Sequence, residues 1–185
     1  TGCVVWPSAH SLSAHLCANP NLVRGRNVVE LGAGTGLVGF VAAALGAKRV
    51  VLTDLPSALP LLRRNIARNS VACGNAVSVA ELRWGDDLGS DFGDQPVVIG
   101  CEIIYQHDEE TYAALVDTML RLTESGGECL FVYEFREGLI ADLEFFDRVN
   151  LAFDVDVVPL GKYGFGVPQG EETSRLLYGY KRKCA

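Results

Sequence analysis

The chain has 185 residues, of which 49% are hydrophobic, so it is long enough to form one domain with a large core. Its formal net charge of −7 argues against nucleic acid as the main partner and mildly favours a cationic one. The longest apolar stretch is too short to cross a bilayer. The sequence also does not begin with a charged segment followed by an apolar run, the pattern of a signal peptide. We therefore expect no membrane partner and a cytoplasmic location, with the nucleus as the alternative.

Helix and strand signals alternate along the whole chain without a linker or a repeat, which predicts a single domain over residues 1–185. In chain order, the expected elements are the end of a helix at 12–17, strand 28–31, helix 36–45, strand 48–53, helix 56–69, strand 77–82, strand 97–101, helix 109–122, strand 128–133 and helix 138–149. The helix over 56–69 has Pro56 at its start, where a missing N–H does no harm. This alternation is typical of a doubly wound α/β fold with a mostly parallel sheet.

The last two expected strands, 153–158 and 174–180, are joined by the glycine- and proline-rich loop 161–170. This connection predicts an antiparallel pair at the edge of the sheet. A series of parallel units that ends in such a pair differs from the six-stranded parallel sheet of a dehydrogenase.

The segment from Asn27 to Asp54 carries the clearest functional pattern: an apolar strand, a glycine turn, a helix and a second strand that ends in a carboxylate. The turn contains Gly32, Gly34 and Gly36, which allow a sharp backbone turn with no Cβ facing a ligand. Asp54 follows about 20 residues later, where a carboxylate can accept hydrogen bonds from both ribose hydroxyls. The pattern therefore favours an adenosine-containing cofactor over a bare structural βαβ unit.

Two cofactor classes use such a unit, because residues 34–39 also satisfy the dinucleotide pattern GxGxxG, a weak signal alone. Glu30, at the end of the first strand, distinguishes them. Its carboxylate would repel a pyrophosphate, whereas S-adenosyl-L-methionine brings an ammonium and a sulfonium. The residues favour this methyl donor, and an NAD-binding oxidoreductase is the remote alternative.

The cysteines and histidines do not predict a metal site. The six cysteines are far apart and form no CxxC pair, which indicates reduced, mostly buried thiols. The three histidines show no metal-ligand spacing.

Four segments in order resemble the family 16 protein-lysine methyltransferases, which are seven-stranded, class I, S-adenosylmethionine-dependent enzymes with a Rossmann-like sheet whose final strand is antiparallel. The segments are Val5-Trp6-Pro7-Ser8-Ala9, the glycine segment from Val29 to Gly39, Leu82-Arg83-Trp84-Gly85 and Glu102-Ile103-Ile104-Tyr105. The resemblance covers nearly the whole chain. The family's usual chain begins earlier. Residues 1–26 are therefore expected to be an N-terminal segment that begins partway through the family's N-terminal region.

The resemblance implies a cofactor site. Trp84 is expected to stack on the adenine and Trp6 to close the methionine end of the pocket, although either could be a core tryptophan. Leu55 and Cys101 are expected to flank the cofactor. The full expected cofactor set is Trp6, Glu30, Gly32, Gly34, Gly36, Asp54, Leu55, Trp84 and Cys101.

The acceptor site implied by the resemblance follows the fourth strand, where the family has Asp-x-x-Tyr and this chain has Glu102 and Tyr105. We expect Glu102 to capture the acceptor nitrogen and Tyr105 to shape the channel. The added methylene of Glu shifts the carboxylate and leaves the target residue open, because a related branch with Glu here methylates a histidine of a protein. The resemblance thus implies a protein substrate methylated on lysine, with S-adenosyl-L-homocysteine as the second product.

Other readings are a protein-histidine methyltransferase, a small-molecule amine methyltransferase and a cofactor-binding module without catalysis. Methylation of a nucleic-acid amino group is disfavoured, because the Pro-Pro-aromatic segment it needs is absent after the fourth strand. His107, Glu109, Glu110 and loop 161–170 are expected to contact the acceptor.

Overall fold

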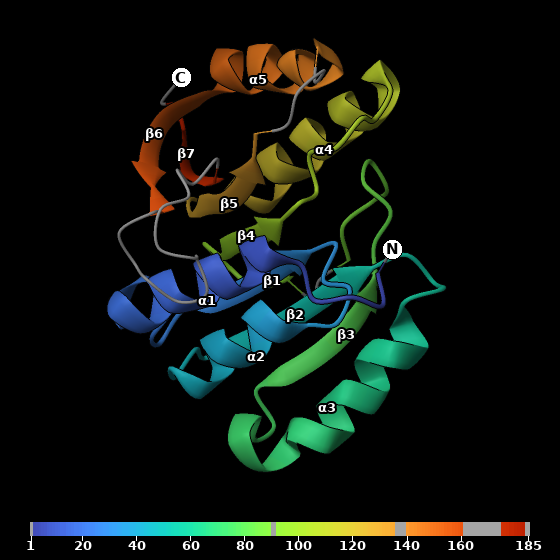
Figure 1. Ribbon diagram of the computed structural model, residues 1–185, viewed down its shortest axis with the longest axis vertical. Helices are drawn as coiled ribbons and strands as arrows, with labels where there is room; N and C mark the ends of the chain where they lie inside the picture. The colour runs from blue at the N-terminus through green and yellow to red at the C-terminus, as the bar shows by residue number, and fades with distance from the viewer. Residues whose placement is uncertain (1, 90–91, 136–139, 161–174, 184–185) are drawn as a thin grey trace.

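The computed structural model describes residues 2–89, 92–135, 140–160 and 175–183, and within them seven strands form one sheet (Figure 1). The strands are β1 (Asn27–Leu31), β2 (Arg49–Asp54), β3 (Val77–Glu81), β4 (Val97–Cys101), β5 (Glu128–Glu134), β6 (Phe153–Pro159) and β7 (Arg175–Arg182). Their order in the sheet is β3-β2-β1-β4-β5-β7-β6. The first five are parallel, and β7 is antiparallel to both β5 and β6. The expected mixed sheet with an antiparallel final strand is confirmed.

Helices cover both faces of this sheet (Figure 1). They are α1 (Pro7–Ala18), the short 3₁₀ helix η1 (Pro20–Leu22), α2 (Leu37–Ala44), α3 (Leu59–Cys73), α4 (Glu109–Leu122) and α5 (Ile140–Ala152). One core joins α1, α2 and α3 to one face, and the other joins α4 and α5 to the opposite face. On β1, Val28 belongs to the first core and Val29 to the second, because side chains alternate along a strand. Strands that are buried on both faces have continuous apolar sequences, and these apolar runs allowed the strands to be predicted.

The observed starts of α2, α3, α4 and α5 lie within a few residues of the expected ones, and α3 shows why its start lies later in the sequence than expected. This helix begins at Leu59, and Pro60 lies in its first turn, whereas Pro56 lies before the helix. A helix that began at Pro56 would place Pro60 where its ring meets the carbonyl four residues earlier. The second proline therefore sets the start.

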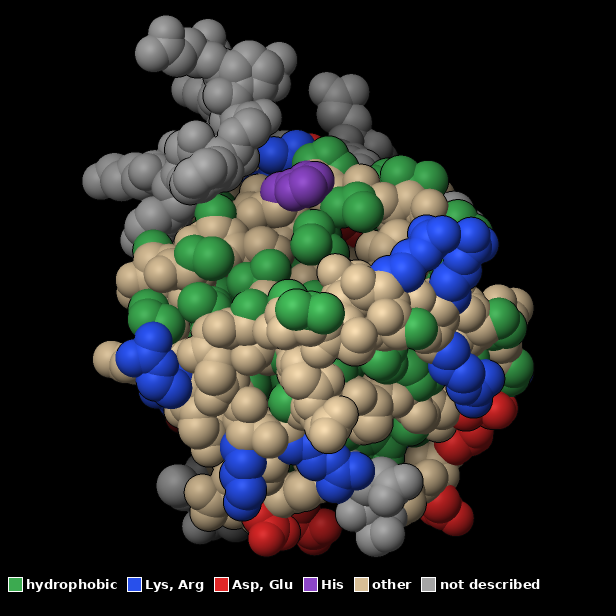
Figure 2. Space-filling model, turned by 90° about the horizontal axis from the view of Figure 1, so that it is seen from below, with side chains coloured by type: hydrophobic (Ala, Val, Ile, Leu, Met, Phe, Trp, Pro, Cys, Tyr) green, Lys and Arg blue, Asp and Glu red, His purple; other side chains and the backbone are tan. Residues whose placement is uncertain are grey.

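The two helical layers differ in charge. Helices α1, α2 and α3 contain three arginines and no acidic residue, whereas α4 and α5 contain six acidic residues and two arginines. Figure 2, which looks at the molecule from the end where α3 lies, shows Lys and Arg side chains spread over this face and Asp and Glu near its margin. Of the two helical layers, the one formed by α4 and α5 therefore carries the net negative charge.

The cysteines of the described residues are free, as expected, but only part of the set is buried. Cys73 and Cys129 are buried, Cys101 is half-buried, and Cys3 and Cys17 are exposed. The described part of the chain contains no helix that is both long enough and apolar enough to span a membrane.

Candidate cofactor and acceptor site

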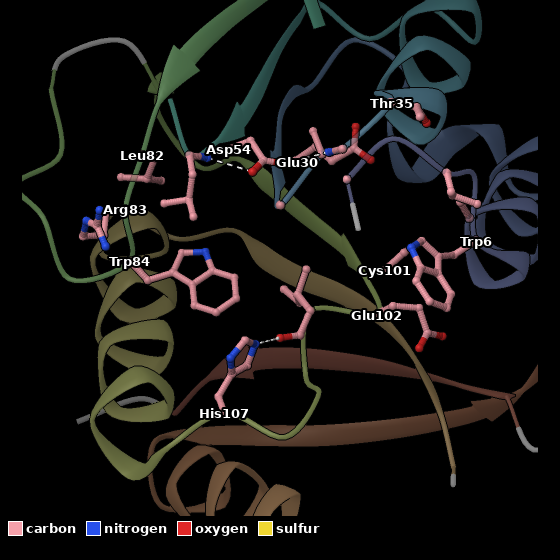
Figure 3. A pocket seen from close by; sticks show the side chains of 18 of the residues that line it. Trp6, Glu30, Thr35, Asp54, Leu82, Arg83, Trp84, Cys101, Glu102 and His107 are labelled. Atoms are coloured by element: carbon pink, nitrogen blue, oxygen red, sulfur yellow. Dashed lines mark hydrogen bonds between the residues drawn. The ribbon is translucent and has the colours of Figure 1, made fainter. Parts of the chain in front are cut away.

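A cavity of about 630 Å³ opens at the carboxyl ends of β1, β2 and β4 (Figure 3). The strand order reverses at this point, since β1 lies between β2 and β4, and open α/β sheets bind ligands at such a switch point. Nine of the eleven expected site residues line the cavity: Trp6, Glu30, Gly32, Gly34, Asp54, Leu55, Trp84, Cys101 and Glu102. Gly36 and Tyr105 do not.

Asp54 is held at the cavity by backbone hydrogen bonds to both of its oxygens. Its Oδ2 accepts from the Gly34 amide at 2.8 Å, and its Oδ1 accepts from the Leu55 amide at 2.7 Å. A carboxylate can accept about four hydrogen bonds, so each oxygen retains capacity for a ribose hydroxyl. The glycine turn and β2 thereby fix the orientation of this acid.

Glu30 lies deeper and is only 4% exposed. Its Oε2 accepts a hydrogen bond from the Gly39 amide at 2.9 Å. Burial raises the pKa of this carboxyl to about 8, the negative charge of Asp54 adds to the rise, and the Gly39 hydrogen bond opposes it. The raised pKa favours the protonated form of this carboxyl, whereas the sequence led us to expect a carboxylate. A cation beside it would favour the charged form.

Trp84 lies at the opposite side of the cavity from Trp6, as Figure 3 shows. Its ring meets that of His107 edge to face, with centroids 5.4 Å apart, and His107 in turn meets Tyr112. Nε2 of His107 lies 3.1 Å from the Ile103 carbonyl. This chain of contacts fixes an indole at the cavity, where a planar base could stack.

The glycines of the turn act partly by packing against the protein itself. Gly36 has a positive φ of 81°, and a Cβ there would lie 2.9 Å from a Leu52 methyl carbon. Gly32 lines the cavity, yet a Cβ on it would meet Ile103 at 2.8 Å. At Gly36, which does not line the cavity, the missing side chain makes room for the core, and the expected role of this glycine at the cofactor stays a prediction.

Of the two residues that were expected to bind the acceptor, Glu102 lines the cavity and Tyr105 does not. Glu102 has a left-handed backbone with φ 54°, and its amide donates to the Val132 carbonyl at 3.2 Å. Its carboxylate accepts a hydrogen bond from the hydroxyl of Ser8 on α1. Tyr105 is 45% exposed and lies outside the cavity lining.

A buried acid that sequence reasoning missed supports the loop after β4. Asp142 on α5 is 1% exposed and accepts hydrogen bonds from the Gln106 amide at 2.9 Å, from the Tyr133 hydroxyl at 3.0 Å and from the Tyr112 hydroxyl. Gln106, like Glu102, has a positive φ. Asp142 therefore anchors one end of a strained loop whose other end is Glu102.

Several further residues line the cavity without having been expected to bind the cofactor: Leu82, Arg83, His107, Glu110, Thr111 and Ala114. Leu82 and Arg83 belong to the segment Leu82-Arg83-Trp84-Gly85, whose resemblance to the family was the signal available in the sequence. Tyr163 and Phe165 of loop 161–170 lie outside the described residues. Within the described ranges, no cluster of three or more His, Cys, Asp or Glu side chains could hold a metal ion.

Residues 1–152 match the family model described as lysine methyltransferase. Protein N-lysine methyltransferase METTL21A of Danio rerio is 38% identical over 158 residues, which are 84% of this chain and 70% of that protein. EEF1A lysine methyltransferase 3 of Xenopus tropicalis is 39% identical over 62% of this chain, and METTL21E of Bos taurus is 38% identical over 85% of it. The chain spans only 50% and 55% of these last two proteins.

Solved structures share the fold at low sequence identity. A glycopeptide N-methyltransferase complexed with S-adenosyl-L-methionine has a TM-score of 0.72 at 16% identity, covering 93% of this chain and 87% of that one. Magnesium protoporphyrin IX methyltransferase from Synechocystis with bound S-adenosyl-L-homocysteine has a TM-score of 0.64 at 16% identity, covering 95% and 81%.

Proposed function

The chain belongs to the lysine methyltransferase family, which makes it a methyltransferase that uses S-adenosyl-L-methionine, and we propose that it methylates a lysine side chain of a protein substrate. The observation that carries this proposal is the meeting of Glu30, Asp54, Trp84 and Glu102 around one cavity at the switch point of the sheet.

The residues present fit the cofactor. Asp54 is oriented for two ribose hydroxyls, Trp84 offers an aromatic face for the adenine, and the buried Glu30 carboxyl offers a site for positive charge. Cys101 lies beside Glu30 and Glu102, and burial together with these two acids raises the pKa of its thiol well above the usual value. Cys101 thus remains a neutral wall residue rather than a competing nucleophile.

When bound, S-adenosyl-L-methionine supplies a methyl group already activated by its sulfonium. The chain must supply an acceptor nitrogen with a free lone pair. A lysine amine with an ordinary pKa near 10.4 is neutral in only about one part in a thousand at pH 7.4, a handicap of roughly 4 kcal/mol. Removal from water lowers this cost, while the Glu102 carboxylate favours the ammonium. We therefore assign Glu102 to capturing and orienting the nitrogen rather than to removing its proton.

The charge distribution supports a cationic acceptor. Glu102 and Glu110 line the cavity, and Asp108 caps α4, whose first two residues are Glu109 and Glu110. Acidic groups at the entrance attract a lysine-bearing segment and repel phosphate. The arginine-bearing α3 lies next to β3 at one edge of the sheet (Figure 1).

A protein histidine is the second candidate acceptor, because this chain has Glu102 at the position where the lysine methyltransferases that it resembles have Asp. A histidine ring is largely neutral at physiological pH and would need no help to lose a proton. A small-molecule amine is the third candidate.

Transfer of isotopically labelled methyl from S-adenosyl-L-methionine into a cytosolic extract tests the proposal. We expect a labelled protein whose label lies on lysine by mass spectrometry and is lost with Asp54→Ala. Label on histidine would replace lysine by the second candidate, and label only in small molecules would overturn the protein substrate. Binding of NADH in place of S-adenosyl-L-homocysteine would overturn the whole assignment.

A further inference from the structure

The first turn of α1 packs directly against the residues that end β4. Trp6 and Ala9 line the cavity, and Ser8 between them is 0% exposed. The Cys101 thiol donates to the Ser8 carbonyl, with Sγ and O 3.7 Å apart. The Ser8 hydroxyl donates to Oε1 of Glu102. Ser8, a buried residue of α1, therefore contacts both Cys101, the last residue of β4, and Glu102, the residue proposed to bind the acceptor.

We propose that Ser8 is a positioning residue for methyl transfer: its hydroxyl holds the Glu102 carboxylate in the orientation that captures the acceptor nitrogen. The inference rests on the proposed function for the role of Glu102. It assigns to the Trp6-Pro7-Ser8-Ala9 segment a task beyond closing the cofactor pocket.

The physical need for such a residue follows from the Glu102 side chain. Three rotatable bonds separate its carboxylate from the backbone, and its backbone is left-handed, with φ 54°. Reacting atoms must be held about 3–3.5 Å apart, so a carboxylate that samples several rotamers would capture the nitrogen in unproductive positions. A hydrogen bond from a buried hydroxyl to a carboxylate is among the stronger ones and restricts this freedom.

The hydroxyl is also held rigidly. Ser8 is the second residue of α1, whose Leu12 and Leu16 are fully buried in the core shared with α2 and α3. The helix therefore fixes the donor, and Glu102 adapts to it. A purely structural role for Ser8 would instead require only that its hydroxyl be satisfied, with no consequence for Glu102.

The first test needs neither cofactor nor acceptor. The carboxyl carbon of Glu102, assigned with Glu102→Gln, is followed by NMR as pH is changed in the full chain and in Ser8→Ala. We expect its titration midpoint to rise in Ser8→Ala, because a hydrogen bond donated to a carboxylate favours the charged form. Ser11→Ala is the matched control, since Ser11 lies on the same helix and its hydroxyl donates to the Pro7 carbonyl, at 3.4 Å, rather than to a residue of the cavity. An unchanged midpoint in Ser8→Ala would overturn the proposal.

The second test uses n-butylamine, which carries the end of a lysine side chain, with S-adenosyl-L-homocysteine present. We expect Ser8→Ala to weaken n-butylamine binding about tenfold, as loss of a hydrogen bond to a charged group does, while the affinity for S-adenosyl-L-homocysteine changes less than twofold. The double variant with Glu102→Gln should bind no more weakly than Glu102→Gln alone, because Ser8 acts through Glu102.

Additive losses in the double variant, or an equal loss of cofactor affinity, would contradict a positioning role. If Glu102→Gln itself leaves n-butylamine binding unchanged while the NMR midpoint still moves in Ser8→Ala, the coupling of Ser8 to Glu102 stands and the acceptor-capturing role of Glu102 in the proposed function fails. The two proposals are thus separated.

Discussion

The backbone amide of Gly39 donates to Oε2 of Glu30 at 2.9 Å, in a position where any side chain on residue 39 would meet the same oxygen. A Cβ there would lie 2.7 Å from that oxygen and 2.2 Å from a Leu52 methyl carbon. The last glycine of the GxGxxG pattern is therefore required by a buried acid and by close helix–strand packing, and it gives no support to dinucleotide binding.

Substitution of this glycine tests the packing. We expect Gly39→Ala to lower the free energy of unfolding by about 1–3 kcal/mol, because Leu52 and Glu30 must both move to admit the methyl group. Urea unfolding without cofactor measures the change. Gly89→Ala is the control, since a Cβ at Gly89 has nothing within 4 Å. Equal stability of the two variants would show that α2 can shift away from the sheet without cost.

The pKa of Glu30 predicts an unusual dependence of stability on pH. Its folded pKa of about 8 lies above its ordinary value of 4.5, so the folded chain binds more protons than the unfolded chain between these values. The contribution of Glu30 to stability is thus fully present below about pH 4.5 and is lost as pH rises through about 8, by about 1.4 kcal/mol for each unit of difference. Glu30→Gln, which keeps a neutral acceptor for Gly39, should remove this slope in urea unfolding without cofactor.

The exposed Glu81 provides the control for that measurement. Glu81→Gln removes a carboxylate from the surface and shows what the loss of one charge does to the measured profile. If the free energy of unfolding of Glu30→Gln changes with pH as that of the parent chain does, between about pH 4.5 and 8, the carboxyl of Glu30 titrates near its ordinary value and the burial argument fails.

The same carboxyl predicts proton release on cofactor binding. A sulfonium and an ammonium beside Glu30 favour its charged form, so binding of S-adenosyl-L-methionine near pH 7 should release protons. Calorimetry in two buffers of different ionisation enthalpy measures this release. We expect less release with S-adenosyl-L-homocysteine, which lacks the sulfonium charge, and the Glu30 contribution to vanish in Glu30→Gln. Equal proton release by the parent chain and Glu30→Gln would assign it to another group, such as the ligand's own amine.

Sequence was sufficient for the elements because their signals are local. β4 and α4 were expected at the residues where they lie, since a strand buried on both faces is a continuous apolar run and a helix with one apolar face has a 3.6-residue period. Asp54 and the glycine turn were found for the same reason, because their relation depends on one βαβ unit.

The contacts that organise the acceptor side could not be found in this way. Ser8 and Glu102 are 94 residues apart, and Gln106 and Asp142 are 36 apart. Each pair meets only because α1 and α5 dock on opposite faces of the sheet. Asp142 is buried and Asp147 on the same helix is exposed. The sequence of α5 does not distinguish the two, because each has an apolar residue next to it in the sequence.

An unsatisfied hydroxyl in the core shows where stability can be gained. Tyr180 on β7 is fully buried among aromatic rings, including Phe131 and Phe153, and its hydroxyl has no hydrogen-bond partner within the part of the chain that the structure describes. Tyr180→Phe removes this buried polar group and should raise the free energy of unfolding by about 1 kcal/mol in urea. Tyr178→Phe, on the same strand and half-buried, is the control. A loss of stability in Tyr180→Phe would reveal a bond that the hydroxyl makes.

Asp142 should link stability to the acceptor side of the site. Its carboxylate accepts from Gln106, Tyr112 and Tyr133, and both phenols keep their protons at neutral pH because burial and the neighbouring carboxylate raise their pKa. In Asp142→Asn an amide N–H must face one of these donors, so we expect a loss of about 1–3 kcal/mol in urea unfolding. Tyr133→Phe removes one donor only and should cost less.

The loop held by Asp142 also contains Glu102, so its loosening should affect the acceptor more than the cofactor. We expect Asp142→Asn to weaken n-butylamine binding severalfold and to weaken binding of S-adenosyl-L-homocysteine less, as measured by calorimetry. Asp54 and Glu30 lie on β2 and β1, away from α5, and Asp142 reaches Trp84 through Tyr112 and His107. Asp147→Asn, exposed on the same helix, should change neither quantity. Equal losses for acceptor and cofactor in Asp142→Asn would instead mean that the whole cavity depends on α5.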